Sequence, residues 1–232
     1  MMIQLLLAGS DKKITINPSK IIAVGLNYRD HVKESKTFGD KGHDVPKEPV
    51  LFAKTPNVLI GPGEPIVLPD HIKEYNLPDE RSDPECELAI IMGKKGRHIP
   101  QEKAFDYVLG YTCFNDVSQR NIQRSDPSGW FRGKSFDTFG PIGPVIVSHK
   151  DIGDPQALNL SCKINGILKQ SGNTRDMIFS IPVLIAYISK QFTLEEGDVI
   201  ATGTPAGVSP IVSGDIVEVE VEKIGILRNP VK

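Results

Sequence analysis

The chain is poor in aromatic residues and cysteine: aromatics make up 6% of its 232 residues, and there are three cysteines. Cys86, Cys113 and Cys162 are scattered and form no CxxC pair, which argues against a disulfide framework or a zinc site and for a reducing cytoplasm. No apolar run approaches the roughly 20 residues that a membrane helix needs. The formal net charge of -2 implies no bulk attraction to nucleic acid or anionic membrane. The sequence therefore predicts a cytoplasmic protein with no nucleic-acid or membrane partner.

Most of the ordered segments predicted from the sequence are strands. Hydrophobic residues make up 39% of the chain, enough for the core of one large domain. Asn165-Gly166 predicts a hairpin turn, and one helix is expected over residues 181–190, with Ser180 as N-cap and Pro182 in its first turn. Short apolar runs predict strands at residues 21–24, 51–54, 107–114, 145–147, 160–164 and 217–221. The pattern predicts an α+β fold dominated by strands, with few helices.

The two ends of the chain differ in how much core they can build. Residues 1–16 are expected to form short strands around a turn at residues 9–11, too small an element to bury a core alone. We therefore treat residues 1–16 as an N-terminal appendage and residues 17–232 as the main domain. A polar stretch over residues 35–48, with glycines, a proline and no apolar period, predicts a mobile loop.

Glu85-Cys86-Glu87 is the most informative stretch of the chain. Successive side chains of a strand point to opposite faces, so Glu85 and Glu87 share one face, roughly 7 Å apart at the backbone. Two such carboxylates repel each other unless a proton or a cation lies between them. Because an apolar run follows at residues 88–92, the pair predicts half of a site for a hard metal ion, with Cys86 facing the other way into packing.

A third oxygen ligand is available in Asp116, which follows the apolar strand that ends near Phe114. Three carboxylates and no paired histidines favour Mg²⁺ or Mn²⁺, or Ca²⁺, over zinc. Three carboxylates around a divalent ion leave a local charge of about -1 by counting, which would repel an anionic substrate. Lys134 is the basic residue that we expect to offset this charge.

Each of these residues also has an ordinary interpretation. An isolated E-x-E is usually a solvated strand face, and a single lysine such as Lys134 is usually a surface residue. Asp116 and Gln119 fit a capping box, so Asp116 could be the N-cap of a short helix. The spacing alone therefore supports a metal site only weakly.

His31 and Glu34 are spaced as neighbours on one helical turn, in a segment that Asn27 could cap. A glutamate in this position can orient an imidazole and raise its basicity, and the base can then act on water without a serine nucleophile. In isolation such a pair is more often found on the surface. His43, in the polar stretch, is a weaker alternative base.

The chain resembles the fumarylacetoacetate hydrolase family in seven blocks that follow one another in the family's order. These blocks lie at residues 24–31 (VGLNYRDH), 85–89 (ECELA), 114–118 (FNDVS), 133–141 (GKSFDTFGP), 173–179 (NTRDMIF), 203–208 (GTPAGV) and 229–231 (NPV). The resemblance covers the chain from Ile21 to Pro230. One departure is visible: relatives often read Ser-Ala-Arg-Asp where this chain has Ser118-Gln119-Arg120-Asn121.

The resemblance implies a mixed β-roll catalytic domain over residues 17–232, usually as a homodimer. It implies that Glu85, Glu87 and Asp116 bind a divalent metal, commonly Mg²⁺ or Mn²⁺, and that Lys134 lies beside it and contacts substrate. Gln123 and Thr204 match positions that often contact substrate in relatives. Family members use a pair like His31 and Glu34 on a segment that closes over the substrate. The resemblance therefore implies that the polar stretch over residues 35–48 closes over bound substrate. We interpret His71, His98 and His149 as structural or surface residues.

The activity implied by the family is metal-dependent chemistry on 2-oxo or 2,4-dioxo carboxylic acids through a stabilised enolate. We expect C–C bond hydrolysis or decarboxylation, of the acylpyruvate hydrolase or oxaloacetate decarboxylase type. The alternatives are a hydroxyheptadienedioate isomerase or decarboxylase, an oxaloacetate keto–enol tautomerase, and a metal-stabilised scaffold that binds small acids without turnover. All the enzymatic alternatives share one enolate, so the metal residues do not distinguish them.

Overall fold

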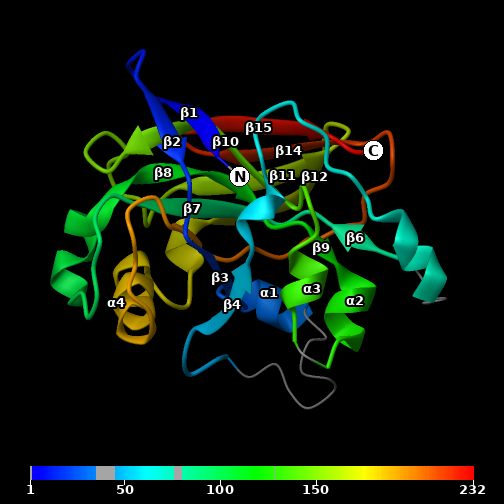
Figure 1. Cartoon of the computed structure of the whole chain (residues 1–232), viewed down its shortest axis with the longest axis horizontal. Helices are drawn as coiled ribbons and strands as arrows, with labels where there is room; N and C mark the ends of the chain where they lie inside the picture. The colour runs from blue at the N-terminus through cyan, green and yellow to red at the C-terminus, as the bar shows by residue number, and fades with distance from the viewer. Residues whose placement is uncertain (1, 35–44, 76–79, 128) are drawn as a thin grey trace.

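Strands form most of the framework in the computed structural model, which describes residues 2–34, 45–75, 80–127 and 129–232 (Figure 1). The large sheet has the strand order β2-β1-β10-β8-β7-β13-β3-β4, and β5 pairs with β10 off this path. It is mixed, because β1 and β5 run parallel to β10 and β13 runs parallel to β3, whereas the other pairs are antiparallel. Its strands are β1 (Ile3–Leu7), β2 (Lys13–Ile16), β3 (Ile21–Gly25), β4 (Val50–Lys54), β5 (Leu59–Ile60), β7 (Cys86–Met92), β8 (Val108–Asn115), β10 (Gly140–Ser148) and β13 (Val199–Ala201).

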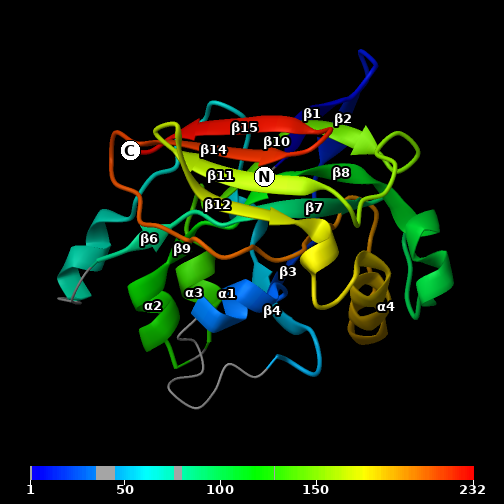
Figure 2. The ribbon, with the colours of Figure 1, turned by 180° about the vertical axis from the view of Figure 1, so that it is seen from behind.

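A second sheet, with the order β12-β11-β14-β15, packs on the large one, and the short strands β6 and β9 form a separate pair (Figure 2). These strands are β6 (Ser82–Asp83), β9 (Ser118–Gln119), β11 (Asn159–Ile164), β12 (Ile167–Asn173), β14 (Ile216–Val221) and β15 (Gly225–Pro230). In both ribbon views the α-helices lie together on one side of the sheets. The α-helices are α1 (Arg29–Glu34), α2 (Arg120–Ser125), α3 (Phe131–Lys134) and α4 (Ile181–Gln191), and 3₁₀ turns occupy η1 (Pro56–Val58), η2 (Asp70–Tyr75), η3 (Gln101–Tyr107) and η4 (Thr174–Asp176).

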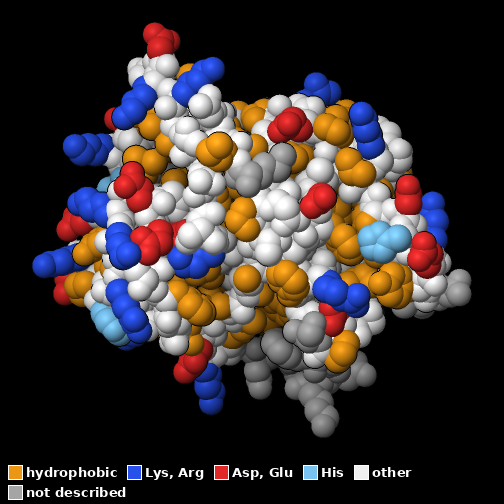
Figure 3. Space-filling model, in the orientation of Figure 1, with side chains coloured by type: hydrophobic (Ala, Val, Ile, Leu, Met, Phe, Trp, Pro, Cys, Tyr) orange, Lys and Arg blue, Asp and Glu red, His pale blue; other side chains and the backbone are white. Residues whose placement is uncertain are grey.

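The predicted fold class, a strand-dominated mixed sheet with few helices, is confirmed, and the sheets curl into a half-barrel. Within the described residues, no helix has the length and apolar character that a membrane crossing requires. Figure 3 shows charged side chains of both signs around the edge of one face, with hydrophobic side chains in small scattered groups. This face therefore carries no patch of a single charge.

Strand β7 lies at the centre of the core and is buried along its whole length. Its residues Cys86, Leu88 and Ile90 belong to the larger apolar cluster, which also contains residues of β11, β14 and α4. Ala89 and Ile91 belong to a second cluster on the opposite face. Burial on both faces explains why the sequence after Glu87 is continuously apolar, and Cys86 faces the packing as predicted.

Local signals in the sequence agree with the structure at two places. Helix α4 begins after Ser180, its N-cap, with Pro182 in the first turn. Asn165 and Gly166 join β11 to β12 with φ values of 52° and 76°, as a two-residue hairpin of the I′ kind requires.

Asn27 does not cap α1, which corrects the expectation from the sequence. Its side-chain amide donates to the carbonyl oxygen of Thr202 at 2.8 Å, and its Oδ1 accepts from the backbone N–H of Phe179, also at 2.8 Å. Asn27 therefore ties the segment before α1 to two distant loops. The side chain is used for tertiary contacts because it is fully buried, with no exposed surface.

The N-terminal hairpin β1–β2 extends the edge of the large sheet through the pairing of β1 with β10. Ile3, Leu5 and Ile16 are buried in the second apolar cluster together with Ile142 and Ile146 of β10. The division of the chain after residue 16 stays a prediction, and the shared cluster offers a way to test it.

We predict that Leu5→Ala lowers the free energy of unfolding of the whole domain by about 2–5 kcal/mol, because it leaves a cavity in a shared cluster. Urea unfolding followed by circular dichroism measures the change. Leu6→Ala is the matched control, since Leu6 is 44% exposed and its loss is expected to cost less than about 0.5 kcal/mol. An unchanged main transition in Leu5→Ala would show that the hairpin is an independent appendage.

Candidate functional site

The antiparallel pairing of β7 and β8 brings the three predicted metal ligands together. Cys86 lies opposite Asn115, and the backbone N–H of Asp116 donates to the carbonyl oxygen of Glu85 at 2.9 Å. Glu85, Glu87 and Asp116 each offer a carboxylate oxygen, and these oxygens lie within 4.8 Å of one another. All three side chains are buried. Asp116 is not a helix N-cap, because α2 begins later and Gln119 caps it by accepting from Ile122 N.

Two buried lysines neutralise part of this carboxylate group. Lys134, at the end of α3, places its Nζ 2.6 Å from Glu85 Oε2 and 2.7 Å from Asp116 Oδ2. Lys54, at the end of β4, lies 2.5 Å from the other oxygen of Asp116 and also donates to the carbonyl oxygen of Val117. The predicted position of Lys134 beside the carboxylates is therefore found in the structure, and Lys54 adds a second positive charge that the sequence did not indicate.

A third basic residue, Arg120, continues the charge network outward. Its Nη2 lies 2.6 Å from Glu85 Oε1, and its Nε lies 2.8 Å from Asp83 Oδ2. The other oxygen of Asp83 accepts from Arg81 Nε at 2.6 Å. Glu85 thus binds both Lys134 and Arg120, and Asp83 joins two arginines.

Burial and neighbouring charges shift the ionisation of these groups in opposite directions. Burial alone would raise the pKa of Glu85, but Lys134 and Arg120 hold it well below its ordinary value. Burial, together with the nearby charges of Asp116 and Glu85, raises the pKa of Glu87 well above its ordinary value. Burial and the charge of Lys134 lower the pKa of Lys54 to about 8, although Asp116 opposes the shift. Burial and the neighbouring carboxylates therefore disfavour the ionised form of Glu87.

The chemistry of Glu87 shows that the group fits a divalent cation. Glu87 is 1% exposed, and its Oε2 accepts from the backbone N–H of Gly203 at 2.8 Å. No ion pair to Glu87 occurs within the described parts of the chain. A buried carboxylate with two similar neighbours and no basic partner suits a hard cation with oxygen ligands.

The turn at Gly203 is built to hold Glu87. Gly203 has a φ of 97°, a conformation that residues with a Cβ rarely adopt. A Cβ at this position would lie 2.7 Å from the Cβ of Asn27 and 3.0 Å from the carbonyl oxygen of Val24. Because Asn27 also binds the carbonyl oxygen of Thr202, the same residue fixes the turn and the start of the α1 segment.

His31 and Glu34 lie on α1 and line the same cavity as Glu85 and Glu87. His31 Nδ1 is 3.5 Å from Glu34 Oε2, a contact too long for a well-formed hydrogen bond. The backbone N–H of Gly207 donates to the same Glu34 oxygen at 2.9 Å. The contact with His31 is the largest effect and lowers the pKa of Glu34; burial opposes it, and the Gly207 N–H lowers the pKa further. The predicted pair is therefore present and faces the carboxylates.

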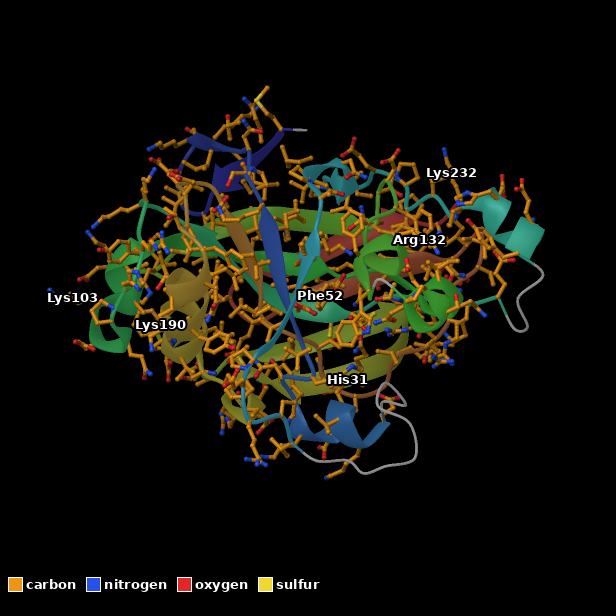
Figure 4. All side chains as sticks on the ribbon, turned by 60° about the horizontal axis from the view of Figure 1, so that its bottom comes forward. His31, Phe52, Lys103, Arg132, Lys190 and Lys232 are labelled. Atoms are coloured by element: carbon orange, nitrogen blue, oxygen red, sulfur yellow. The ribbon has the colours of Figure 1, made fainter. Side chains whose placement is uncertain are left out.

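The cavity has a volume of about 690 Å³ and one aromatic wall. Phe52 and Trp130 meet edge to face with ring centroids 5.2 Å apart, and Lys134 Nζ lies 4.9 Å from the Phe52 centroid. Gly25 allows this wall to form, because a Cβ there would lie 2.4 Å from the Trp130 ring. In Figure 4, His31 and Phe52 lie near the middle of the molecule.

The two predicted substrate contacts, Gln123 and Thr204, also line the cavity. Gln123 Oε1 accepts from Arg120 Nη1 at 3.0 Å, which leaves its amide N–H groups as donors. The Thr204 hydroxyl donates to the carbonyl oxygen of Cys86 at 2.9 Å and accepts from Gln170 Nε2 at 2.8 Å. Their contacts with substrate stay predictions.

The three other histidines that the structure describes lie outside this cavity. His149 stacks on Phe105 and bonds to the Tyr111 hydroxyl at 3.0 Å, whereas His71 packs against Phe136. His98 donates its backbone N–H to Ser189. The alternative base His43 and residues 35–44 of the expected mobile loop lie outside the described residues.

Sequence reasoning missed Lys54, Arg120 and Asp83 as members of the site. Arg120 stands in the block that follows the metal aspartate, where the departure from relatives was visible. The sequence signal for Lys54 was weaker, because it consisted only of a lysine at the end of an apolar strand. Asp83 had no clear signal, because only one of its arginine partners, Arg81, is near in sequence, and the other, Arg120, lies 37 residues away.

We predict that Lys54→Met lowers the free energy of unfolding by about 3 kcal/mol in the presence of chelator, because it removes one partner of a fully buried ion pair. Lys33→Met is the control, since Lys33 forms an exposed pair with Asp30 and its loss is expected to cost less than about 0.5 kcal/mol. Urea unfolding measures both values. Equal effects in the two variants would contradict the energetic role of Lys54.

Comparisons with known proteins find relatives that match most of the chain. The chain is 41% identical to human oxaloacetate tautomerase FAHD2A, mitochondrial, over 222 residues, which cover 92% of this chain and 67% of that protein. It matches the crystal structure of 5-carboxymethyl-2-hydroxymuconate delta-isomerase from Mycobacterium smegmatis with a TM-score of 0.80 and 39% identity, covering 96% of this chain and 85% of that one. It also matches fumarylpyruvate hydrolase from Pseudomonas aeruginosa in complex with Mn²⁺ and pyruvate, with a TM-score of 0.85 and 27% identity, covering 99% and 95% of the two chains.

The family model described as fumarylacetoacetate (FAA) hydrolase C-terminal matches residues 20–232. The match covers the carboxylate group, Lys134, the His31–Glu34 pair and both sheets except strands β1 and β2. The chain belongs to the fumarylacetoacetate hydrolase family.

Proposed function

We propose that this protein is a metal-dependent enzyme that acts on small 2-oxo acids through their enol form. One observation carries the proposal: a single cavity is lined by Glu85 and Glu87, by Lys134, and by the His31–Glu34 pair. Carboxylates that can hold a cation, a basic side chain and a general base then meet at one place. A pure binding scaffold has no need for the base.

Glu85, Glu87 and Asp116 are the residues that would hold Mg²⁺ or Mn²⁺. Such an ion, when bound, supplies Lewis-acid stabilisation of negative charge on the oxo-acid head group. Lys134 donates a hydrogen bond to the oxo oxygen as negative charge grows there. Phe52 and Trp130 limit the access of water on one side of the cavity.

His31 moves the proton in this proposal. Glu34 lies on the Nδ1 side of the imidazole and favours a proton on that nitrogen, so Nε2 is free to accept one. The Gly207 N–H holds Glu34 in place while the imidazole becomes charged. The Glu34 carboxylate then stabilises the imidazolium, as the third member of a triad does.

Keto–enol interconversion of oxaloacetate is the first candidate reaction. His31 Nε2 takes a proton from C3 of the keto form, the C2–C3 double bond forms, the C2 oxygen takes a proton from water to give the enol, and His31 returns its proton to water. The name of the human relative, at 41% identity over 92% of this chain, favours this reaction.

Cleavage of a C–C bond in an acylpyruvate is the second candidate, favoured by the fumarylpyruvate hydrolase that matches 99% of this chain. Here His31 takes a proton from water, which attacks the distal carbonyl; the C–C bond next to that carbonyl then breaks, which releases a carboxylic acid and the enolate of pyruvate, and the enolate takes up the proton from His31. Decarboxylation of oxaloacetate needs no attacking water, and an isomerase moves a proton between carbon atoms. A homodimer and a cytoplasmic location stay predictions.

We predict that Glu87→Gln and Asp116→Asn each weaken Mn²⁺ binding more than about 100-fold, because even the loss of a partner outside the ligand set costs about 10–100-fold. Isothermal titration calorimetry measures the affinity. Glu220→Gln, on the exposed side of β14, is the matched control and should bind Mn²⁺ as the unmodified protein does. Full turnover in excess chelator would rule out the metal-dependent proposal.

We predict that His31→Ala lowers kcat/KM for oxaloacetate enolisation about 100-fold or more, since it removes the general base, while Mn²⁺ affinity changes less than about twofold. Turnover of oxaloacetate, acetylpyruvate and a dienedioate is compared side by side in the loaded enzyme. His149→Ala is the control, because His149 lies outside the cavity. Unchanged rates in His31→Ala would remove the pair from the mechanism.

A further inference from the structure

The outer part of the cavity contains an arginine that the proposed reaction does not use. Arg120, Gln123 and Arg124 line the cavity and stand at positions i, i+3 and i+4 of α2, which share one side of a helix. Arg120 is fully engaged by Glu85, Asp83 and Gln123. Arg124 is one turn further along, about 6 Å at the ordinary helical rise.

The side chain of Arg124 is exposed, and its guanidinium forms no hydrogen bond or ion pair with any residue that the structure describes. Arg81 lies beside the same helix, because the backbone N–H of Arg120 donates to the carbonyl oxygen of Arg81 at 2.8 Å. Arg81 binds Asp83 through Nε and the carbonyl oxygen of Val208 through Nη2, and Nη1 has no partner within the described residues. Two guanidinium groups with unused donors therefore face the outer cavity.

The acidic residues of the outer cavity do not neutralise Arg124. The Asp126 carboxylate pairs with Arg132, on α3. Glu34 lies against His31 and accepts from the Gly207 N–H. A guanidinium left unpaired at the mouth of a polar cavity is suited to bind a carboxylate of the ligand.

The charges of the inner cavity also favour a ligand with two negative charges. Asp83, Glu85, Glu87 and Asp116 are matched in number by Lys54, Arg81, Arg120 and Lys134. The addition of a divalent cation to this balanced group gives an excess of two positive charges. A dianion restores the balance, whereas a monoanion does not.

We propose that Arg124, assisted by Arg81, binds the distal carboxylate of the substrate and makes the enzyme selective for 2-oxo dicarboxylic acids over 2-oxo monocarboxylic acids of equal length. The inference rests on the proposed function, because the oxo-acid head must first bind beside Glu85, Glu87 and Lys134. Arg124 is then a specificity-determining residue that does not touch the reacting atoms. The proton chemistry of His31 is the same for both classes of acid.

The test uses two five-carbon probes that differ only at the distal end, 2-oxoglutarate and 2-oxopentanoate. Their affinities for the Mn²⁺-loaded full-length protein are measured by isothermal titration calorimetry. We expect 2-oxoglutarate to bind at least about tenfold more tightly, as one charge-assisted hydrogen bond allows. Arg124→Gln should lose about tenfold for 2-oxoglutarate and less than about twofold for 2-oxopentanoate, and Arg124→Lys should restore part of the preference.

Arg175→Gln is the matched control, because Arg175 lies on η4 outside the cavity and should leave both affinities unchanged. Thermal unfolding of each variant shows that the exposed substitution leaves the fold intact. Equal binding of the two probes by the unmodified protein, or an equal loss for both in Arg124→Gln, overturns the inference and leaves the proposed function standing. If neither probe binds in the presence of Mn²⁺, the proposed function fails and the inference fails with it.

Discussion

The site depends on a group of buried charges that must be balanced before the sheet around them can pack. A buried carboxylate without a partner costs several kcal/mol, so Glu85 and Asp116 depend inside the fold on Lys134, Lys54 and Arg120. The lysines come from α3 and β4, elements distant in sequence from β7 and β8. Charge balance therefore joins four elements, α3, β4, β7 and β8.

A second constraint links the carboxylates to His31, the proposed general base. Asn27 binds the loops at Thr202 and Phe179, and the Gly203 N–H next to Thr202 holds Glu87. Since α1 begins two residues after Asn27, the position of His31 is set by the same backbone that orients Glu87. The base and the carboxylates are thus held by rigid contacts, which is what a reaction that needs close alignment requires.

Much of this arrangement could be predicted from the sequence wherever a local period or turn carried the information. The two-residue period placed Glu85 and Glu87 on one face and Cys86 on the other, and Asn165-Gly166 marked a hairpin. The position after a strand, the charge count and the helical spacing suggested Asp116, Lys134 and the His31–Glu34 pair, and the family resemblance strengthened these assignments. Lys54 and Asp83 could not be predicted in this way, because their partners lie 62 and 37 residues away and are chosen by strand pairing and helix docking. Asn27 was misassigned for the same reason: its real partners are 152 and 175 residues distant.

In the proposed function, the inner group of charges determines the chemistry on the oxo acid, and the outer cavity determines which oxo acid binds. Inside, the same residues support enolisation, hydrolysis or decarboxylation, because each route passes through negative charge at one oxygen that Lys134 can stabilise. In the outer cavity, the preference between two acids depends on what each acid offers to the unpaired guanidinium of Arg124. The distal carboxylate of a dicarboxylate is a strong partner for this group, whereas the methyl group of a monocarboxylate is none. A single exposed residue on α2 can therefore change substrate preference without altering the reaction, whereas no change among the buried charges can do so without disturbing the fold.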